Sequence, residues 1–504
     1  MRTRRLFLLL ALVLPALAGT QHVWILHTND IHGALLPSTA WWLNRDFPPP
    51  LGNAASALHL ISSMRAEADE KGYGFLVLDA GDVYKGAPIG DMTKGMAVVD
   101  YFNRAGYDAV GVGHYDYAEG LDVLRDMAEA SEMPWLNANI RVAGTDTTPS
   151  FLTPSIVLER GGVKLGIPGL ITTYNNERIA DAVVGDMDVA DERDVARAEI
   201  AALRERGADV IVGLTHIGHR YEKRLAENVA GFDVIVGGRS NTALYVPVET
   251  PTHHTIVNQA ASKLTAVGFL DLEVDTETKR ITGYDGRLIN LYAEEIPQDP
   301  GYARYLDSLR AEAEAGFDEV IGECAATLTR HDGRESPAGN MVTDAMREYF
   351  GVDVALHNSS GIRKDVPEGP VTYRDAFEID GFGNTMVVGT YTGRQVREML
   401  ELSVNERFWI LQVSGLEMTY DPDAPFGSKV KSVVVGGEQL LPDATYRVVT
   451  NSYLGAEEGR YGVFQDGENV ENTEVPLRDA IARYFRRNSP VSARVEGRIV
   501  PLRD

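Results

Sequence analysis

The sequence is poor in cysteine and in basic residues. Cys324 is the only cysteine among 504 residues, which excludes an intramolecular disulfide and a lipid anchor on a cysteine at an export cleavage site. Lysine and arginine number 48 against 73 aspartates and glutamates, and the net charge of −25 makes a nucleic-acid polymer or an anionic membrane surface a poor partner. A small anionic substrate stays compatible with this charge, because a metal ion or a local arginine can reverse the field within one cleft.

Long hydrophobic runs are missing after the first 19 residues. Residues 1–19 have the layout of a secretory signal: a basic start at residues 2–5, an apolar core at residues 6–17 and an Ala-x-Ala cleavage site at residues 16–18. The apolar core is shorter than the ~20 residues that a membrane-spanning helix needs. We therefore expect an exported protein, periplasmic or extracellular, with no stable membrane anchor.

The rest of the chain divides into two parts with different patterns. Between residues 23 and 291, short apolar runs typical of strands alternate with helical patterns, which indicates an α/β layered domain. Residues 299–317 predict one amphipathic connector helix, and the pattern from about residue 320 onward predicts an α+β domain. The predicted divisions are a signal peptide (1–19), an α/β domain (20–295), a connector (296–319) and an α+β domain (320–504).

Three predicted strands end on residues of the types that bind metals. Asp30 and His32 follow the first, Asp82 follows the second, and His216 ends the third. In open α/β sheets, functional residues collect at the carboxyl ends of strands. Carboxylate and imidazole groups that converge there can bind one cation, so these residues are candidate metal ligands.

Further motifs extend this pattern through the chain in a fixed order. They are HTNDIHG (27–33), DAGD (79–82), LTHIG (214–218), DVIVGG (233–238), GN (339–340), TDAMR (343–347), SGIR (360–363), FGNT (382–385) and LQVSGL (411–416). Together they resemble the 5′-nucleotidase and UDP-sugar hydrolase family over nearly the whole mature chain. The resemblance implies a layered metallophosphoesterase β-sandwich of the calcineurin-like type, flanked by helices, and then an α+β C-terminal domain of the 5′-nucleotidase type.

The resemblance also implies two divalent metal ions that share Asp82. The first would take Asp30, His32 and the last residue of a G-G-H-S-[QH] motif, which is Asn241 here. The second would take His216 together with an asparagine and a histidine of the family pattern. Zinc, manganese, magnesium and calcium all stay open as the metal.

The chain departs from the family pattern at residues 113–120. They read GHYDYAEG where the family has G-N-H-E-F-D-x-G. The flanking glycines fix the register, so His114 replaces the asparagine ligand, Tyr115 falls on the catalytic histidine, and Ala118 falls on the aspartate that orients it. An imidazole can bind a metal in place of an amide. A register shifted by one residue would instead make His114 the catalytic histidine, at the cost of a local bulge.

A second departure is Arg239, which replaces the histidine ligand of G-G-H. A guanidinium carries a permanent charge and cannot bind a cation. We therefore expect the second ion to keep only Asp82, His114 and His216, and to bind more weakly than the first. Arg239 can instead offer a fork of donors to a phosphate or sulfate-like oxyanion. Tyr115 and Arg239 are the candidate catalytic residues.

The resemblance implies that the C-terminal domain binds the substrate. Two rings would hold a nucleobase, arginines would hold phosphate, and an asparagine would contact the base. The matching positions are Phe382 and Tyr453 for the rings, Arg363 with either Arg330 or Arg334 for the phosphate, and Asn384 for the base. Core packing is the alternative for the two rings. The family's G-G-D-G-Y is EEGRY (457–461) here, so a glycine replaces the aspartate that contacts ribose.

These patterns predict a metal-dependent phosphoric ester hydrolase that acts on a nucleotide or a related small phosphate ester. Two alternatives stay open. Thiosulfohydrolases of sulfur oxidation resemble this chain in placing a histidine and then an aromatic residue where nucleotidases have Asn-His. A nucleotide-binding homologue would keep the fold and the metal but have little turnover.

Overall fold

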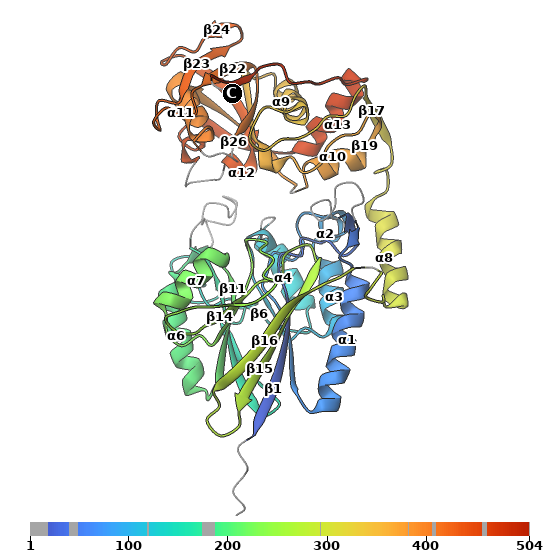
Figure 1. The fold of residues 1–504 in the computed structure, drawn as a ribbon, viewed down its shortest axis with the longest axis vertical. Helices are drawn as coiled ribbons and strands as arrows, with labels where there is room; N and C mark the ends of the chain where they lie inside the picture. The colour runs from blue at the N-terminus through green and yellow to red at the C-terminus, as the bar shows by residue number, and fades with distance from the viewer. Residues whose placement is uncertain are drawn as a thin grey trace, which may run out of the picture.

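The computed structural model describes residues 19–39, 49–117, 120–173, 187–292, 294–381, 383–405, 410–455 and 461–502. Figure 1 shows two bodies stacked along the long axis, and the chain passes from one to the other through α8. Some predictions fall on residues outside the described ranges. They are the leader (1–18), Ala118, Phe382 and the segment 457–460.

The N-terminal body contains two six-stranded sheets. The strands of the first, in spatial order, are β16 (Ile281–Asn290), β15 (Ala266–Asp275), β1 (Thr20–Thr28), β4 (Gly74–Asp79), β5 (Ala109–Gly111) and β6 (Trp135–Leu136). Those of the second are β13 (Val248–Glu249), β14 (Ile256–Asn258), β12 (Val234–Gly237), β11 (Val210–His216), β9 (Val163–Ile171) and β8 (Ser155–Arg160). The central pairs β1–β4 and β11–β12 are parallel, so their carboxyl ends lie at one edge of each sheet.

Apolar side chains from the two sheets meet in a shared core. Ile25 and Leu76 of the first sheet lie in one buried cluster with Leu165 and Val212 of the second. Helices cover both outer faces (Figure 1). Those over the first sheet are α1 (Ala54–Lys71), α3 (Met96–Ala105) and α4 (Leu121–Ala130), and those over the second are α6 (Glu192–Glu205) and α7 (His219–Asn228). These layers confirm the predicted β-sandwich flanked by helices.

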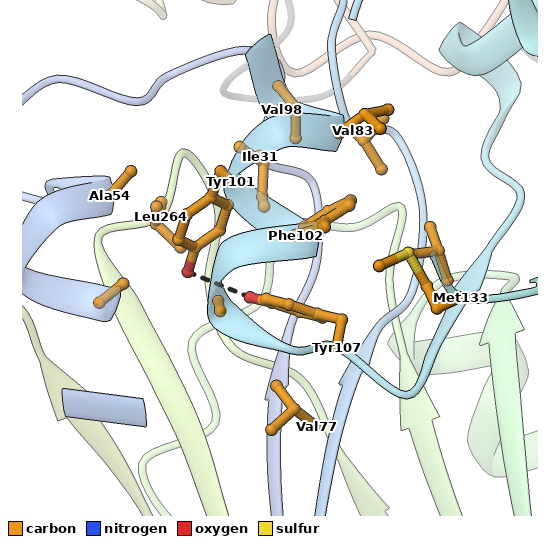
Figure 2. Packing of buried hydrophobic residues seen from close by; sticks show 14 of the residues in the cluster. Ile31, Ala54, Val77, Val83, Val98, Tyr101, Phe102, Tyr107, Met133 and Leu264 are labelled. Carbon is orange, nitrogen blue, oxygen red and sulfur yellow. Dashed lines mark hydrogen bonds between the residues drawn. The ribbon is translucent and has the colours of Figure 1, made fainter. Parts of the chain in front are cut away.

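A buried aromatic cluster lies between the first sheet and its helices (Figure 2). The hydroxyl oxygens of Tyr101 and Tyr107 are 3.2 Å apart within it. Ile31 is fully buried in the same cluster. Because Ile31 stands between Asp30 and His32, its burial fixes the loop that carries both candidate ligands.

The connector is α8 (Pro300–Ala313), which packs on α1 and on α2 (Pro88–Thr93). The Asp299 side chain caps its start by accepting a hydrogen bond from the backbone N–H of Tyr302 at 2.7 Å. The helix ends at Ala313 rather than at the predicted Phe317. Gly316 explains the early end, because its φ of 85° is not helical.

The C-terminal body is an α+β domain, as predicted. Its five-stranded sheet has the order β21 (Leu411–Ser414), β18 (Val354–Asn358), β25 (Thr445–Asn451), β20 (Thr385–Thr392) and β26 (Glu468–Pro476). The smaller sheets are β24 (Glu438–Gln439), β23 (Val430–Val435), β22 (Leu416–Tyr420) and β27 (Ile499–Pro501), and the pair β17 (Val320–Cys324) and β19 (Gly369–Thr372). Its helices include α9 (Pro337–Phe350), α10 (Tyr373–Ile379), α11 (Gly393–Ser403), α12 (Ser452–Gly455) and α13 (Leu477–Asn488).

Candidate metal centre and substrate site

The structure brings five of the predicted ligands together at the carboxyl ends of the central strands. Their donor atoms form two groups, each with its atoms within 4.8 Å of one another. The first group is Asp30, His32 and Asp82, and the second is Asp82, His114 and His216. Asp82 belongs to both groups, which is the position that a carboxylate shared by two cations would occupy.

The loops that carry these ligands have an unusual backbone. Asp30, His32 and Asp82 have φ angles of 51°, 52° and 58°, in the left-handed region that non-glycine residues rarely adopt. Each such residue costs about 1–3 kcal/mol and persists only where its surroundings fix it. The backbone N–H of His32 donates to the carbonyl of Asp82 at 2.9 Å, and that of Asp30 donates to the carbonyl of Gly81 at 2.9 Å. The two ligand loops therefore hold each other.

In the first group, Asp30 is fully buried. Its carboxylate accepts hydrogen bonds from the Asn29 side chain at 2.6 Å and from the backbone N–H of Arg239 at 2.9 and 3.0 Å. Burial raises the pKa of Asp30 to about 6, although His216 nearby opposes the shift. The Nδ1 atom of His32 lies 2.9 Å from the carbonyl of Lys85, and its Nε2 lies 3.9 Å from Asp30.

In the second group, the His216 Nδ1 lies 2.8 Å from the carbonyl of Ala80. Its Nε2 is 3.0 Å from a carboxylate oxygen of Asp82 but lacks the geometry of a hydrogen bond. Burial opposes charge on this imidazole, yet the Asp82 carboxylate outweighs it and raises the pKa of His216 to about 9. A ligand role for His216 therefore requires the loss of a proton. The rings of His114 and His216 are 5.3 Å apart between centroids.

These donor atoms fit a divalent cation. In His32 and His216 a backbone carbonyl faces Nδ1, which leaves Nε2 toward the group, the outer-shell arrangement common at metal sites. The buried Nε2 of His216 has no hydrogen-bond partner of its own within the described residues. Mixed imidazole and carboxylate ligands suit zinc or manganese better than calcium, which prefers oxygen ligands only.

Tyr115 lies beside the centre through its backbone and its ring. Its N–H donates to Asp82 at 2.8 Å, and the ring makes an edge contact with His32 at 5.4 Å between centroids. Gly113, two residues earlier, leaves no room for a side chain, because an added Cβ would lie 2.2 Å from the Asp82 nitrogen. His114, between these two residues, lies with Asp82 and His216 in the second group of candidate ligands.

Asp116 is a site residue that our sequence reasoning missed. Its buried carboxylate accepts hydrogen bonds from the backbone N–H groups of Asp82, Val83 and Gly113 at 3.0, 2.8 and 2.7 Å. Burial, and then the charge of Asp82, raise the pKa of Asp116 to about 8. An acidic residue at the glutamate position of the G-N-H-E pattern was the available signal.

Glu222 was missed as well. This buried carboxylate on α7 accepts hydrogen bonds from the Gln259 side chain at 2.7 Å and from the backbone N–H groups of Gly218 and Gly238 at 3.2 Å. Burial raises its pKa to about 7. Glu222 thereby fixes the loop that ends β12 and carries Arg239. No sequence motif marks it, since its partners come from separate segments.

Arg239 and Asn241 follow β12 with φ angles of 78° and 52°. One Nη of the Arg239 guanidinium donates to the carbonyl of Ile217, the residue after His216, at 3.4 Å. Asn241, the predicted third ligand of the first ion, is exposed. Within the described ranges, no hydrogen bond links its side chain to Asp30, His32 or Asp82. Its role as a ligand of the first ion stays a prediction.

Two of the predicted substrate arginines of the C-terminal domain lie at the surface. Arg363 is exposed, and one Nη donates to the carbonyl of Ser360 at 3.1 Å. Partial enclosure by the protein and the nearby Arg330 guanidinium lower the pKa of Arg363. Arg334 is exposed, and its backbone carbonyl accepts from the Gln412 side chain at 2.9 Å.

Asn384 and Tyr453 face the protein. The buried Asn384 amide donates to Asp380 at 3.0 Å and accepts from the Ser452 hydroxyl at 3.4 Å. The amide keeps a second N–H and a second lone pair, so contact with a base stays a prediction. Tyr453, on α12, is half-buried and packs against an apolar cluster that includes Leu454. The other predicted ring, Phe382, lies outside the described residues.

Known proteins share this architecture. Residues 317–466 match the family model for the 5′-nucleotidase C-terminal domain. The trifunctional nucleotide phosphoesterase protein YfkN of Bacillus subtilis (strain 168) is 27% identical over an alignment of 541 positions, gaps included. The alignment covers 96% of this chain and 35% of that relative, so this chain spans about a third of the relative's length. The 5′-nucleotidase of Vibrio vulnificus (strain CMCP6) is 26% identical over 526 residues, which cover 94% of this chain and 91% of the relative.

A solved structure agrees over the whole length. The crystal structure of a 5′-nucleotidase precursor from Thermus thermophilus superimposes with a TM-score of 0.80 at 28% identity, and the match covers 96% of this chain and 100% of that chain. Both bodies and the connector are therefore shared. Residues 317–466 thus belong to the 5′-nucleotidase C-terminal domain family, and over nearly its whole length the chain is similar in sequence and fold to 5′-nucleotidases.

Proposed function

We propose that this chain is an exported, metal-dependent phosphoric ester hydrolase that acts on nucleotides. The observation that carries the proposal is the pair of Asp/His groups sharing Asp82 at the carboxyl ends of the central strands. When bound there, two divalent cations polarise a phosphoryl oxygen, make hydroxide available near neutral pH and neutralise charge in an in-line displacement. Asp30 and His32 would hold the first cation, and His114 and His216 the second.

Two protein groups beside the centre would act on the phosphate. Arg239 supplies a guanidinium, which matches phosphate oxygens in charge and shape. Tyr115 stands at the family's catalytic histidine position, with its backbone fixed on Asp82. A tyrosine hydroxyl can donate a hydrogen bond but transfers its proton poorly near neutral pH. We therefore expect slower turnover than in relatives with a histidine at that position.

The nucleoside end of the substrate would bind in the C-terminal domain. Arg330 lies close enough to Arg363 that its charge lowers the pKa of Arg363. An anionic group beside the two arginines would relieve this repulsion. Tyr453 supplies a ring that can stack on a base. A substrate that reaches both domains would require them to close on it, with α8 as the connection.

Export is part of the proposal and rests on the leader predicted at residues 1–19. In the part of the chain that the structure describes, no helix combines the length and apolarity needed to cross a bilayer. Fusing residues 1–25 to a reporter that acts only after export tests this directly. Retention of the fusion in the cytoplasm would contradict export.

The experiment that tests the activity is a turnover panel on the purified, metal-loaded protein. The panel contains adenosine 5′-monophosphate, a nucleoside diphosphate and p-nitrophenyl phosphate, with Asp82→Asn as the control against contaminating phosphatases. Phosphate release by the wild type that is lost in the variant supports the hydrolase. Nucleotide binding in calorimetry without phosphate release would overturn it in favour of a binding protein.

One observation favours a second candidate, a thiosulfohydrolase. His114 lies with the metal ligands and is followed by the aromatic Tyr115, the order that distinguishes that branch in the sequence comparison above. A cysteine S-thiosulfonate peptide belongs in the same panel for this reason. Sulfate release from the peptide, with no phosphate release from nucleotides, would replace the first function by the second.

A further inference from the structure

A strained loop joins the metal centre to the C-terminal domain. It lies between β14 and β15, and three of its non-glycine residues, Ala261, Lys263 and Leu264, have φ angles of 61°, 54° and 50°. Leu264 is buried in the same cluster as Ile31, the residue next to Asp30 (Figure 2). The surrounding core therefore imposes this backbone shape, which the residues would not adopt alone.

Backbone hydrogen bonds tie this loop to the ligand Asp30. The N–H of Lys263 donates to the carbonyl of Asp30 at 2.8 Å. One residue earlier on the ligand loop, the Asn29 side chain donates to the carbonyl of Ala261 and accepts from the N–H of Ala260, both at 2.7 Å. A shift of the Lys263 backbone would therefore move the backbone of Asp30.

The Lys263 side chain points the other way, to the second body. Its ammonium donates to the carbonyl of Gly381 at 3.4 Å, next to the loop of the predicted substrate residues. Burial and the nearby Arg363 guanidinium lower the pKa of Lys263, while Glu378 opposes this shift. Among the residues the structure describes, no carboxylate pairs with this ammonium. A partly buried ammonium that donates to one carbonyl contributes little to stability. We therefore expect that a lysine at this position serves a function.

We propose that Lys263 is a positioning residue that couples the substrate loop at Gly381 to the metal ligand Asp30. The proposal rests on the function proposed above. One residue then sets the distance between the metal centre and the part of the C-terminal domain that would receive the nucleoside. A lysine suits this role, because its flexible stem and three donors let the contact break and re-form as the domains move. Lys263 would favour substrates long enough to touch both domains.

The kinetic test compares a long and a short substrate. Lys263→Met removes the ammonium and keeps the stem, Lys263→Gln is a second variant should the first unfold, and Lys263→Arg keeps the charge. The matched control is Lys279→Met, because Lys279 also has a left-handed backbone, with φ 58°, and donates to a carbonyl at 3.0 Å, but within its own domain. The measured quantity is kcat/KM for adenosine 5′-monophosphate divided by that for p-nitrophenyl phosphate.

We expect this ratio to fall by roughly tenfold in Lys263→Met, the effect of about one lost hydrogen bond to a charged group. It should recover largely in Lys263→Arg and stay at the wild-type value in Lys279→Met. Equal losses on both substrates would show a general structural role, and an unchanged ratio would show no role. Either result overturns the proposal.

A distance measurement tests the coupling without any activity. Spin labels at exposed positions, Glu70→Cys on α1 and Lys431→Cys on β23, report the separation of the two bodies, because the native Cys324 is buried. Lys263→Met should broaden the distance distribution, and Lys279→Met should not. An unchanged distribution in Lys263→Met would overturn the proposal. A wild-type protein that fails to hydrolyse nucleotides would contradict the proposed function instead, while the distances would still decide the role of Lys263.

Discussion

Predicted residues in the two domains are held in different ways. At the carboxyl ends of the N-terminal strands, Asp30, Asp82 and His216 are almost fully buried, and backbone groups fix each of them. In the C-terminal domain, Arg334 and Arg363 are exposed. Backbone hydrogen bonds of the fold itself therefore fix the residues of the first site. The two arginines of the second carry their charge at the surface, where exposed side chains change rotamer readily.

Removing the shared carboxylate should break the rigid site completely. Asp82→Asn keeps the shape but loses the charge that both groups use, and we expect loss of both metal ions. Turnover should fall by more than about 100-fold, since losing only an outer partner of a ligand costs about 10–100-fold. Metal analysis and phosphate release measure the two effects. Asp271→Asn, a surface carboxylate paired with His22, is the control. A variant that still binds two equivalents would contradict the shared site.

Splitting the two groups should have a smaller effect. His114→Ala removes a ligand from the second group only, so we expect loss of one metal equivalent and retention of the other. The prediction depends on Asp30 and His32 holding the first ion without help. Titration of the metal-free protein with zinc or manganese would measure the stoichiometry. Loss of both ions would mean that the groups bind cooperatively.

The Arg239 guanidinium should matter for anions and leave the metals in place. Arg239→Ala is expected to weaken inhibition by inorganic phosphate by roughly 30-fold, which corresponds to about 2 kcal/mol, the lower end of the range for losing one partner of a buried charge pair, because the side chain is only partly buried. Arg239→Lys should restore part of the affinity, since lysine keeps the charge without the fork. Unchanged inhibition in Arg239→Ala would remove this residue from the site.

The smallest expected effect concerns stability of the C-terminal domain and its dependence on pH. Burial raises the pKa of Asp380 to about 7, above the ordinary aspartate value. The folded state then holds a proton that the unfolded state has released, so stability falls as pH rises from about 4 to 7. Asp380→Asn keeps the contacts of a protonated carboxyl and cannot ionise. We expect its urea stability, relative to wild type, to increase by a few kcal/mol at most over this pH range. If the stability of the wild type and of Asp380→Asn depended on pH in the same way, the raised pKa of Asp380 would be contradicted.

The convergence of the candidate metal ligands could be predicted in part from the sequence. Asp30 and Asp82 follow β1 and β4, parallel neighbours that end at the same edge of one sheet. His216 ends β11 of the second sheet, so its position beside them also depends on how the two sheets pack. Asn241 stands beyond β12, in a loop whose direction the sequence pattern does not specify, so its part in the first group stays a prediction. Lys263 was not predicted either, because its contact with Gly381 spans 118 positions and depends on how the two bodies meet.

The contacts of the predicted substrate residues in the C-terminal domain were harder to predict from the sequence, for a different reason. The resemblance assigns Asn384 a type of contact but cannot tell whether the amide already has partners in this chain. Asp380, only four positions away, accepts a hydrogen bond from one of the amide's two N–H groups. Short-range competition of this kind is common for Asn and Asp, whose side chains bond readily to their neighbours. The same chemistry that makes an asparagine useful to a ligand makes it useful to the fold.

The burial of Ile31 has a consequence for the order in which the protein matures. Asp30 and His32 flank an apolar residue that belongs to the aromatic core, and that core is held together by burial of its apolar side chains, which requires no cation. Small zinc domains fold only when the metal binds, whereas we expect this chain to have a preformed metal-binding site as soon as it folds. We therefore expect stripping and reloading to be reversible, with the unloaded protein resisting proteolysis between cycles. Such a protein would tolerate an environment where the supply of metal rises and falls.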